Sequence, residues 1–572
     1  MLRLFRFLKP HKKVVIVILL VTFLQTLGTL YIPTLTAEIV NNGVAKGDIS
    51  YIIKTGVFML LTVALTAAAA VAGSRLSANL SAGFAKDIRE AMFIKAQEFS
   101  INDFNKIGTA SMITRTTSDV TLIGQTTVMF IQMLLPAPIM AIGGLCLAFA
   151  KDKVMALIIV ATMIAFMLIA FLLGKKVIPL FKLMQIKMDN INRILRETII
   201  GIRVIRAFNR EKYEKGRIDT AATDYASNAI KVNKIIAILI PAIMMIMNLG
   251  IVCILWIGGK RVVKGNMQIG DIMAMAEYCF LILFFLIMGV MMFMYIPRAQ
   301  ACADRINEVL AIAPEITDGS SKHLKRREYA HLEFRNVTFQ YSDAEEPVLS
   351  NLSFESKSGE VTAIIGGTGS GKSTIAKLIP RFFEVQSGYI MVDGTDIKNL
   401  SQKELRDKIG LVPQKAFLFS GTITENIRYG KKDATQEQIE HAAKVAQAHD
   451  FITSLEHGYD SHVAQGGNNL SGGQKQRLSI ARALIRKPEI YIFDDSFSAL
   501  DFKTDARLRR ALKSEIGSST VIIVAQRIST IMDADRIIVL DDGKIVDIGG
   551  HEELMKSCDV YKQIAASQLS EA

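Results

Sequence analysis

Six long apolar stretches in the first half of the chain constrain its fold more than any other feature of the sequence. They lie at roughly residues 14–36, 53–74, 127–149, 154–174, 235–258 and 272–297. A helix needs about 20 apolar residues to cross the roughly 30 Å hydrocarbon core of a bilayer, and each stretch is long enough. The sequence therefore predicts six membrane-spanning helices with a lipid bilayer around them.

The connections between these stretches are unequal in length. Three are short, whereas about 50 residues follow the second stretch and about 60 follow the fourth. Both long segments are polar with helical periodicity, as in LSAGFAKDIREAMFIKAQEF and FKLMQIKMDNINRILRETIIGIRVIRAF. They are predicted to be helices that continue well beyond the bilayer.

The distribution of basic residues predicts the orientation in the membrane. The three short loops hold six Lys or Arg, whereas the N-terminus and the two long segments hold 25. Because basic loops are retained on the cytoplasmic side, the long segments and both chain ends are expected there, in a multi-pass protein of the cytoplasmic membrane. The net charge of +13 is then loop charge, and no nucleic-acid partner is expected, since no basic, aromatic-interleaved motif is present.

The N-terminus and the cysteines argue against other classes of protein. The segment MLRLFRFLKPHKK is basic and amphipathic, and the apolar stretch behind it is long enough to stay in the membrane, so no removable signal peptide is expected. The five cysteines show no CxxC spacing, which indicates neither a zinc site nor a disulfide framework.

Glu277 is an exception among the apolar spans, which are otherwise nearly free of ionisable residues. A charged group costs about 2.5–3.5 kcal/mol at mid-depth in a membrane and less near an interface. Glu277 could line a cavity and contact a cationic substrate. Alternatively, it could reach the outer headgroups or pair with Lys264. Both interpretations stay open at this point.

The composition changes near residue 313. A chain of 572 residues is too long for one core, and its mean hydropathy of +0.31 averages an apolar half with a mixed, soluble half. The stretch APEITDGSSKHLKRRE is polar and typical of a linker. We therefore divide the chain into a transmembrane domain at 1–312, a linker at 313–330 and a soluble domain at 331–572.

The stretch VTAIIGGTGSGKSTIAKLI contains the first functional motif of the soluble domain. It combines an apolar strand, a glycine-rich loop and the start of a helix, and it satisfies the GxxxxGK[ST] pattern. The glycines allow backbone N–H groups to surround phosphate oxygens, while Lys372 reaches the β and γ phosphates and Ser373 can ligate Mg²⁺. The predicted phosphate site comprises Gly366, Gly367, Thr368, Gly369, Ser370, Gly371, Lys372, Ser373 and Thr374.

Four further motifs surround this loop in the sequence. Asp494 ends the strand IYIFD and is a candidate Mg²⁺ ligand. Gln414 follows another strand, and its amide oxygen could contact Mg²⁺ or the attacking water. Tyr341 could stack on adenine or be a core strand residue. A glycine-bearing turn that enters a helix is suited to a second face of phosphate, and its residues are Ser471, Gly472, Gly473 and Gln474.

In order and spacing these motifs, with LSGGQ and SALD, resemble the ATP-binding cassette (ABC) family. Six spans ahead of the cassette resemble a type IV, multidrug-exporter-like half-transporter, and the resemblance covers essentially the whole chain. It implies an all-α six-helix transmembrane domain with long cytoplasmic helical extensions, fused to a soluble α/β P-loop nucleotide-binding domain. Its cofactors would be ATP and Mg²⁺.

The resemblance also implies a mechanism. Two half-transporters would pair, with ATP held between the phosphate loop of one cassette and the LSGGQ of the other, and cassette closure would turn the spans from inward-facing to outward-facing. Coupling helices would lie near EFSINDFNKIG and AFNREKYEKG. Gln414 would link the nucleotide to them, and the segment from Ser498 to Asp501 would cross the dimer interface.

Two positions depart from the family pattern at the hydrolytic machinery. Asp495 stands where the family has a glutamate as general base, and its side chain is one methylene shorter, which spoils the reach a base requires. Gln526 stands where the family has a histidine that contacts the γ-phosphate. Gln465 stands near the position of a glutamate upstream of the signature. These changes predict a site that binds Mg-ATP and hydrolyses it poorly.

The intact LSGGQ points to a partner. It would serve the nucleotide of another subunit, so the chain is expected to be the degenerate-site half of a heterodimeric exporter of small amphiphilic compounds, such as drugs or lipids. The alternatives are a regulatory ATP-binding subunit that gates a partner, and a slow homodimeric exporter. A peptide exporter with an N-terminal peptidase is not expected, because the first span starts near residue 14, and a soluble P-loop ATPase is excluded by the spans.

Overall fold

The computed structural model describes residues 2–292, 295–319 and 331–569, in two compact units. Unit 1 comprises residues 1–95 and 109–311, and unit 2 comprises residues 96–108 and 312–572. Most of the predicted linker, residues 320–330, lies outside the described residues.

Unit 1 is entirely helical among its described residues. Its elements in chain order are η1 (Leu2–His11), α1 (Lys12–Glu38), η2 (Ile39–Val44), α2 (Ile49–Glu98, whose last residues belong to unit 2), α4 (Thr109–Thr114), η3 (Arg115–Asp119), α5 (Val120–Met129), η4 (Phe130–Leu134), α6 (Pro136–Lys151), α7 (Lys153–Ile200), α8 (Ile202–Ala207), α9 (Glu211–Val263), α10 (Ile269–Met292) and α11 (Ile296–Ala311).

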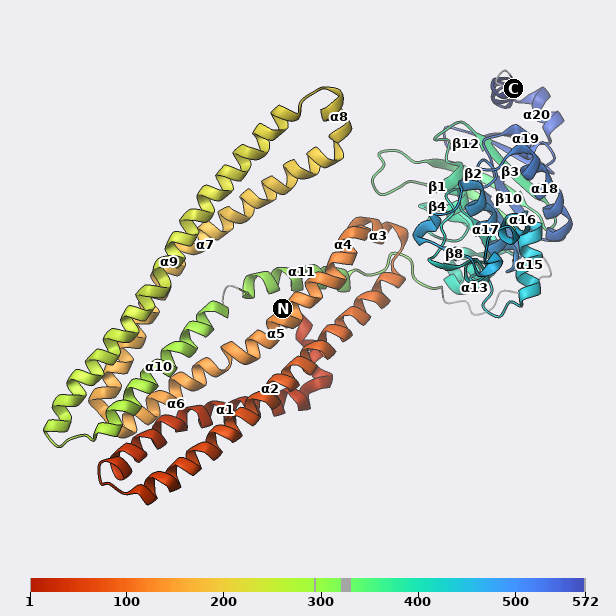
Figure 1. Ribbon diagram of the computed structural model, residues 1–572. Coiled ribbons are helices and arrows are strands. Elements are labelled where there is room, and N and C mark those ends of the chain that lie inside the picture. Colours follow the sequence, from red (N-terminus) through yellow and green to blue (C-terminus); the bar gives the residue numbers. More distant parts are fainter. Residues whose placement is uncertain (1, 293–294, 320–330, 570–572) are drawn as a thin grey trace. The chain divides into compact units, whose positions relative to one another are not determined.

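Within the described part of the chain, six helical segments are long and apolar enough to cross a membrane, which confirms the predicted number. Three of them, α2, α7 and α9, have 50, 48 and 53 residues. At about 1.5 Å per residue each exceeds 70 Å, more than twice the hydrocarbon thickness of a bilayer. The predicted long extensions are thus continuous with the spans, and α7 and α9 lie side by side in Figure 1.

The core of unit 1 is formed by α1, α6, α7, α9 and α10, around fully buried side chains such as Phe166, Tyr278 and Ile282. Polar groups inside this core are paired: the Tyr278 hydroxyl and Thr34 Oγ1 are 2.5 Å apart. Many apolar side chains on the outer faces of the same helices are exposed, as expected for helices that contact lipid.

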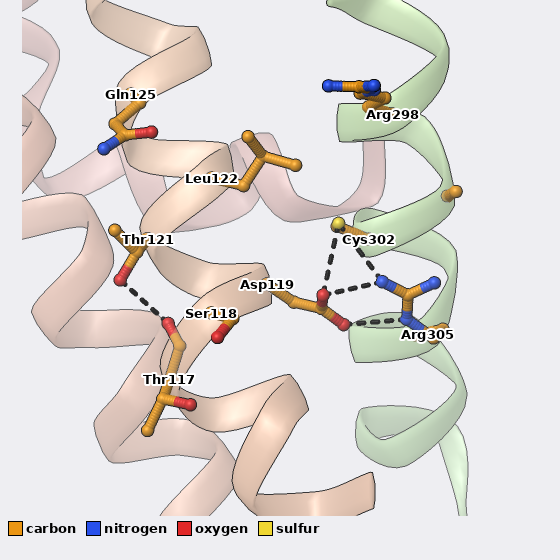
Figure 2. Close-up of a pocket in the computed structure, with 10 residues that line it drawn as sticks. Thr117, Ser118, Asp119, Thr121, Leu122, Gln125, Arg298, Cys302 and Arg305 are labelled. Atoms are coloured by element: carbon orange, nitrogen blue, oxygen red, sulfur yellow. Dashed lines mark hydrogen bonds and ion pairs between the residues drawn. The ribbon is translucent and has the colours of Figure 1, made fainter. Parts of the chain in front are cut away.

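A pocket of about 650 Å³ lies between the η3–α5 segment and α11 in unit 1 (Figure 2). On its floor the buried Asp119 carboxylate accepts hydrogen bonds from Arg305 Nε at 2.8 Å and Arg305 Nη2 at 2.6 Å. The Cys302 thiol donates to the same carboxylate at 3.3 Å. Arg298 lies nearer the N-terminal end of α11 than Cys302 and Arg305, and it makes no ion pair with any described residue.

The described residues of unit 2 form three sheets. An antiparallel sheet has the strand order β2-β1-β4-β5, a six-stranded sheet has the order β12-β11-β3-β10-β9-β6, and β7 pairs with β8. In the six-stranded sheet only β12 runs antiparallel to its neighbour. The strands are β1 (Leu332–Phe339), β2 (Leu349–Ser356), β3 (Val361–Gly366), β4 (Ser387–Val392), β5 (Thr395–Asp396), β6 (Ile409–Val412), β7 (Gly421–Thr422), β8 (His462–Val463), β9 (Ile490–Asp494), β10 (Thr520–Val524), β11 (Arg536–Asp541) and β12 (Lys544–Gly549).

The central strands are buried on both faces, as in parallel sheets covered by other layers. Alternate residues of β3 enter two different cores: Ala363 and Ile365 pack in one, and Ile364 in the other. The α helices of unit 2 that follow the strands are α12 (Lys372–Leu378), α13 (Gln402–Asp407), α14 (Ile423–Arg428), α15 (Gln436–Val445), α16 (His449–Thr453), α17 (Gly472–Leu484), α18 (Phe502–Ile516), α19 (Ile528–Ile531), α20 (His551–Ser557) and α21 (Asp559–Leu569).

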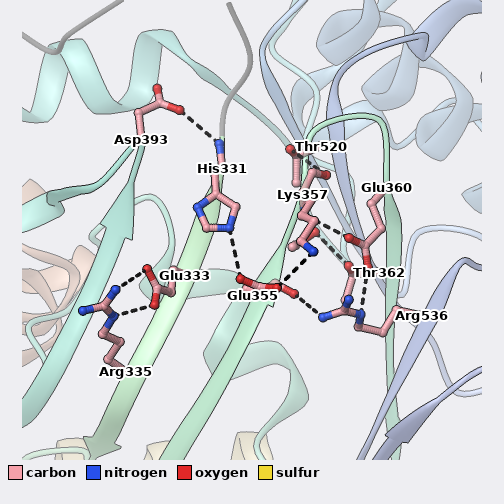
Figure 3. Close-up of polar contacts among 11 residues, drawn as sticks. His331, Glu333, Arg335, Glu355, Lys357, Glu360, Thr362, Asp393, Thr520 and Arg536 are labelled. Carbon is pink, nitrogen blue, oxygen red and sulfur yellow. Dashed lines mark hydrogen bonds and ion pairs between the residues drawn. The ribbon is translucent and has the colours of Figure 1, made fainter. Parts of the chain in front are cut away.

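Charged residues join the two larger sheets of unit 2 (Figure 3). Arg536 on β11 pairs with Glu360 at 2.9 Å and donates to the Glu355 carbonyl oxygen on β2 at 3.0 Å. On the other side of the same strand, His331 lies 3.5 Å from the Glu355 carboxylate. These contacts join β2 of the antiparallel sheet to β11 and the start of β3 in the six-stranded sheet.

A short helix from the first half of the chain, α3 (Ile101–Ile107), belongs to unit 2. It begins with a capping box in which the Ser100 hydroxyl accepts from the Asp103 amide at 3.0 Å. Asp103 in turn accepts from the Glu315 amide at 3.0 Å, and Asn102 accepts from the Ser342 hydroxyl at 2.9 Å. Hydrogen bonds between residues that are 212 and 240 positions apart in the sequence thus attach α3 to the rest of unit 2.

The two architectures together confirm the predicted fold class: a six-helix membrane domain fused to an α/β domain with a P-loop. The stretches predicted to carry coupling helices contain α3 and the turn between α8 and α9.

Candidate nucleotide site

The candidate site lies at the carboxyl edge of four parallel strands, β6, β9, β10 and β3. Val412 pairs with Phe493, Val524 with Asp494 and Val524 with Ile364, so these strand ends are level. The carboxyl edge of a parallel sheet is the usual place for a ligand site, because the loops there meet. Those loops carry Gln414, Asp494 with Asp495, Gln526 and the glycine-rich loop.

The glycine-rich loop follows β3 and leads into α12. Gly369 and Gly371 have φ angles of 88° and 93°, a region that glycine adopts without strain. A Cβ on Gly371 would also contact the Leu349 side chain and come within 3.0 Å of the Val348 carbonyl oxygen. Such turns orient successive backbone N–H groups toward an anion, as the phosphate prediction requires.

Lys372 is folded onto its own loop. Its ammonium donates to the carbonyl oxygens of Gly366 at 2.8 Å and Gly367 at 2.5 Å, and to Ser370 Oγ at 3.3 Å. Burial lowers the pKa of Lys372 below its usual range. A phosphate anion would favour the charged form, so the environment of Lys372 fits an anionic ligand.

Ser373 and Asp494 are in contact. The Ser373 hydroxyl donates to Asp494 Oδ1 at 2.8 Å, from the first turn of α12 to the tip of β9. Burial raises the pKa of the Asp494 carboxyl, which a divalent cation would reverse. A hydroxyl and a carboxylate oxygen together are the hard donors that Mg²⁺ prefers, with phosphates as its other ligands.

Asp495 is buried, at 8% exposure, and its backbone is left-handed with φ 47°. Two amide side chains donate to the same oxygen, Oδ2: Gln414 Nε2 at 3.2 Å and Gln526 Nε2 at 3.1 Å. The two residues predicted to act beside the nucleotide thus meet at the position of the expected base. No described residue donates a hydrogen bond to the other oxygen, Oδ1.

Tyr341 follows β1 and is partly buried. Its hydroxyl lies 3.1 Å from Thr374 Oγ1 on α12, and its ring packs edge-on against Phe339 and Phe383. Tyr341 therefore lies at the edge of a core and beside the phosphate-loop helix, while its stacking on adenine stays a prediction.

The LSGGQ residues form the start of α17. Ser471 is the N-cap: its hydroxyl accepts from the Gln474 amide at 3.3 Å, and the Ser471 amide donates to Gln474 Oε1 at 2.8 Å. Ser471 and Gly472 are exposed. A capped helix N-terminus with exposed N–H groups suits an anion that approaches from outside the domain.

Asp501 caps the N-terminus of a helix in this structure. Its carboxylate accepts from the Thr504 amide at 2.9 Å as the N-cap of α18, and this bond lowers the pKa of Asp501. Ser498 donates to the Asp495 carbonyl oxygen at 2.8 Å, so the segment is attached to the base position. Gln465 is exposed in a short turn before the signature.

Two residues near the site carry no motif and were not found from the sequence. Ser496 donates to the Val412 carbonyl oxygen at 2.9 Å and joins the ends of β9 and β6. Gln568, from α21 near the end of the chain, bonds to the loop that carries Gln526. Only the strand order of the sheet and the place of α21 reveal them.

Glu277 lies on α10, half-buried. It makes no hydrogen bond or ion pair with any residue that the structure describes, so the pairing with Lys264 is absent there. Cavity-lining and interfacial positions both fit this finding.

Comparisons with known families agree with the two-part architecture. The family described as ABC transporter transmembrane region matches residues 15–288, and the family described as ABC transporter matches residues 349–498.

Several whole-length relatives are similar to the chain. An uncharacterized ABC transporter ATP-binding protein of Mycobacterium tuberculosis is 38% identical and covers 98% of this chain and 97% of its own. A protein of the same description from Bacillus subtilis is 38% identical, with 98% of both chains covered. An ATP-dependent lipid A-core flippase of Syntrophus aciditrophicus is 33% identical over 85% of this chain and 80% of the flippase.

The fold also matches a solved structure. A bacterial Atm1-family ABC exporter with ATP bound superposes with a TM-score of 0.81 at 26% identity, over 97% of this chain and 98% of that one. The family matches, the whole-length relatives and the shared fold lead to one conclusion: the chain belongs to the ABC transporters, as an exporter half-transporter.

Proposed function

We propose that this chain is the degenerate-site subunit of a heterodimeric ABC exporter, and that its own phosphate loop binds Mg-ATP but hydrolyses it slowly. The contact of Gln414 and Gln526 with one oxygen of Asp495 is the observation that carries this proposal. ATP would be held by the glycine-rich loop and Tyr341, and Mg²⁺ by Ser373 and Asp494, with Gln414 as a further candidate ligand.

A general base must accept a proton from water at about 2.6–3.2 Å. Asp495 is one methylene shorter than glutamate, and two amides already donate to its Oδ2. Both amides occupy lone-pair positions on the oxygen that would have to accept the proton. Gln526 has no ionisable ring, so it cannot exchange a proton with the γ-phosphate as histidine can. Each of these properties weakens hydrolysis and leaves phosphate binding intact.

The layers of unit 2 support the proposal of a partner. The phosphate-loop helix α12 contributes Ile375 and Leu378 to one core, whereas the signature helix α17 contributes Leu478 and Ile480 to the core on the opposite face of the sheet. This separation supports a signature supplied by another cassette to a nucleotide held by the phosphate loop. Ser471 to Gln474 of this chain would complete the competent site of a partner with glutamate and histidine at the two changed positions.

The transported class is proposed to be small amphiphilic compounds, such as drugs or lipids. Two relatives described as ATP-dependent lipid A-core flippases support this class, as do the apolar outer faces of the spans. Glu277 is the candidate contact for a cationic group. Because basic residues concentrate on the long extensions, we place the cassette and both chain ends on the cytoplasmic side of the cytoplasmic membrane.

The test is ATP hydrolysis by the purified full-length chain, alone and co-purified with a partner half-transporter that carries glutamate and histidine at the two changed positions. Alone it should bind Mg-ATP and show little ATPase, and the pair should turn over ATP and respond to amphiphilic compounds. The Lys372→Ala chain gives the background of contaminating ATPase. Vigorous hydrolysis by the chain alone would overturn the proposal.

Two alternatives have distinct outcomes in the same experiment. A slow homodimeric exporter is favoured by Asp495 Oδ1, which no described residue contacts by hydrogen bond and which could still accept a proton; it predicts slow ATPase in the chain alone that compounds stimulate. A regulatory subunit predicts a pair in which ATP binding to this chain changes the partner's rate but transport needs only the partner's spans.

A further inference from the structure

Gln568 holds the loop that carries Gln526 at two points. Its Nε2 donates to the Gln526 carbonyl oxygen at 2.6 Å, and its Oε1 accepts from the Ile528 amide at 2.8 Å. One side-chain amide thus satisfies both backbone groups that flank Arg527. An ionised carboxylate of equal length has two acceptors and no donor, so glutamate cannot make both bonds.

Gln568 is supported by a firmly packed helix. Tyr561 is fully buried and Ala565 is 5% exposed, and both belong to the core that covers one face of the parallel sheet. Tyr561, Ala565 and Gln568 are spaced i, i+4 and i+7, so they lie along one stripe of α21. The Tyr561 hydroxyl lies 2.8 Å from His551 Nδ1 on α20. The position of Gln568 is therefore fixed by the core.

The loop held by Gln568 reaches two parts of the nucleotide site. The Gln526 side chain donates to Asp495 at 3.1 Å, and the Arg527 guanidinium lies 5.6 Å from the centre of the Phe502 ring, at the start of α18. Asp501, next to Phe502, ends the segment from Ser498 that is predicted to cross the dimer interface. Movement at Gln568 would therefore change both the base position and the segment that faces a partner cassette.

We propose that Gln568 is a positioning residue for the nucleotide site: by fixing the backbone on both sides of Arg527, α21 keeps Gln526 directed at Asp495. This inference rests on the proposed binding of Mg-ATP by this chain and adds the C-terminal helix to the elements that respond to it. Gln568 acts through the loop and contacts no nucleotide itself.

The first test is hydrogen–deuterium exchange of the full-length chain in lipid nanodiscs, with Gln568→Ala and Gln568→Glu. Loss of two neutral hydrogen bonds should speed exchange in residues 526–531 by about 2- to 10-fold. In the wild type, Mg-ATP should slow exchange in residues 366–374 and in residues 526–531. In the variants only the protection of residues 366–374 should remain.

Gln563→Ala is the matched control, because Gln563 is exposed on the same helix and makes no hydrogen bond to any described residue. It makes the same change in helix propensity and should behave as the wild type. If residues 526–531 respond to Mg-ATP equally in Gln568→Ala and wild type, the positioning role is wrong. If residues 366–374 show no protection even in the wild type, ATP binding fails instead, and exchange without nucleotide still tests Gln568.

The second test separates positioning from simple stability. In the Asp495→Glu, Gln526→His chain, Gln568→Ala should lower kcat for ATP by about 2- to 10-fold and change KM less than twofold. Gln568→Asn, which keeps the amide, should recover part of kcat, whereas Gln568→Glu should not. Equal losses for Gln568→Asn and Gln568→Glu, or an effect confined to KM, would contradict the inference.

Discussion

At the residue scale, the proposed slow hydrolysis depends on Asp495, whose side chain is one methylene shorter than that of glutamate. The carboxylate remains at the carboxyl edge of β9, beside the Asp494 that faces Ser373. Its Oδ2 accepts hydrogen bonds from two glutamine side chains, and these two neutral donors fix the orientation of the carboxylate. On the proposed function, an aspartate in this position contacts its neighbours and reaches the attacking water poorly.

Restoring both family residues should restore hydrolysis. For the chain with Asp495→Glu and Gln526→His we expect an ATPase rate at least about 100-fold above that of the unmodified chain, since a positioned general base contributes roughly 10²–10⁴-fold. Phosphate release by the purified chain alone measures this. The same pair of changes combined with Lys372→Ala should remain inactive. No gain from the double change would mean that the defect lies elsewhere.

Gly371 should tolerate no side chain. Its φ of 93° and the closeness of Val348 and Leu349 predict that Gly371→Ala destabilises unit 2 by about 1–3 kcal/mol. Gly367→Ala is the control, since a Cβ there meets nothing within 4 Å. Thermal unfolding without nucleotide should show a lower Tm for Gly371→Ala only. Equal Tm values for the two variants would contradict the steric argument.

At the element scale, α3 is a membrane-domain connection that folds with the cassette. Its Asp103 is 3% exposed and accepts from the Glu315 amide and from the Ser100 amide and hydroxyl. The adjacent Asn102 contacts Ser342, next to Tyr341. The helix therefore meets unit 2 beside the residue predicted to stack on adenine, through the hydrogen bond between Ser342 and Asn102.

The attachment of α3 should weaken in acid. Burial alone would raise the pKa of Asp103, but the hydrogen bonds from Glu315 and Ser100 outweigh it, and the pKa lies below its usual range. A lowered pKa in the folded state stabilises the fold above the unfolded pKa of about 3.9, and this stability is lost as the pH falls below it.

Thermal unfolding between pH 5 and pH 3 measures this loss. The Tm of the wild-type chain should fall more steeply over this range than that of Asp103→Asn, which has no carboxyl to protonate. At pH 7 the wild-type chain should have the higher Tm, because Asp103→Asn lacks charged hydrogen bonds of about 1.5–3 kcal/mol each. Parallel pH profiles for the two chains would show that Asp103 does not contribute.

At the scale of the whole molecule, the sequence predicts what local patterns encode. Span length and the glycine-rich loop are properties of short stretches, and the structure contains both the six spans and the loop. The association of α3 with the cassette depends on contacts more than 200 residues apart, which no local pattern encodes. Likewise, the meeting of Gln414 and Gln526 at Asp495 follows from a strand order that the sequence does not state.

The signature of this chain should matter most in the assembled pair. Ser471→Ala should lower ATP hydrolysis by the co-purified pair at least about tenfold, because the serine would lie at the partner's competent nucleotide, where removing one transition-state donor costs about 10²-fold or more. It should leave ATP binding by this chain alone unchanged.

Ser401→Ala is the matched control for this prediction. Ser401 is also a helix N-cap, with its hydroxyl accepting from the Glu404 amide at 3.2 Å, so the local cost of about 1 kcal/mol is the same. ATPase of the pair should be near normal with Ser401→Ala. Equal losses for the two variants would assign the effect to capping.

The capping box of α3 has a further consequence during synthesis. Asp103 is synthesised 212 residues before Glu315, whose backbone amide donates a hydrogen bond to the Asp103 carboxylate in the folded protein. At about 5–20 residues per second, the helix is complete roughly 10–40 s before its docking surface exists. Ser100 and Asp103 close the helix on themselves, so the nascent chain can keep this turn formed while the cassette is still being translated.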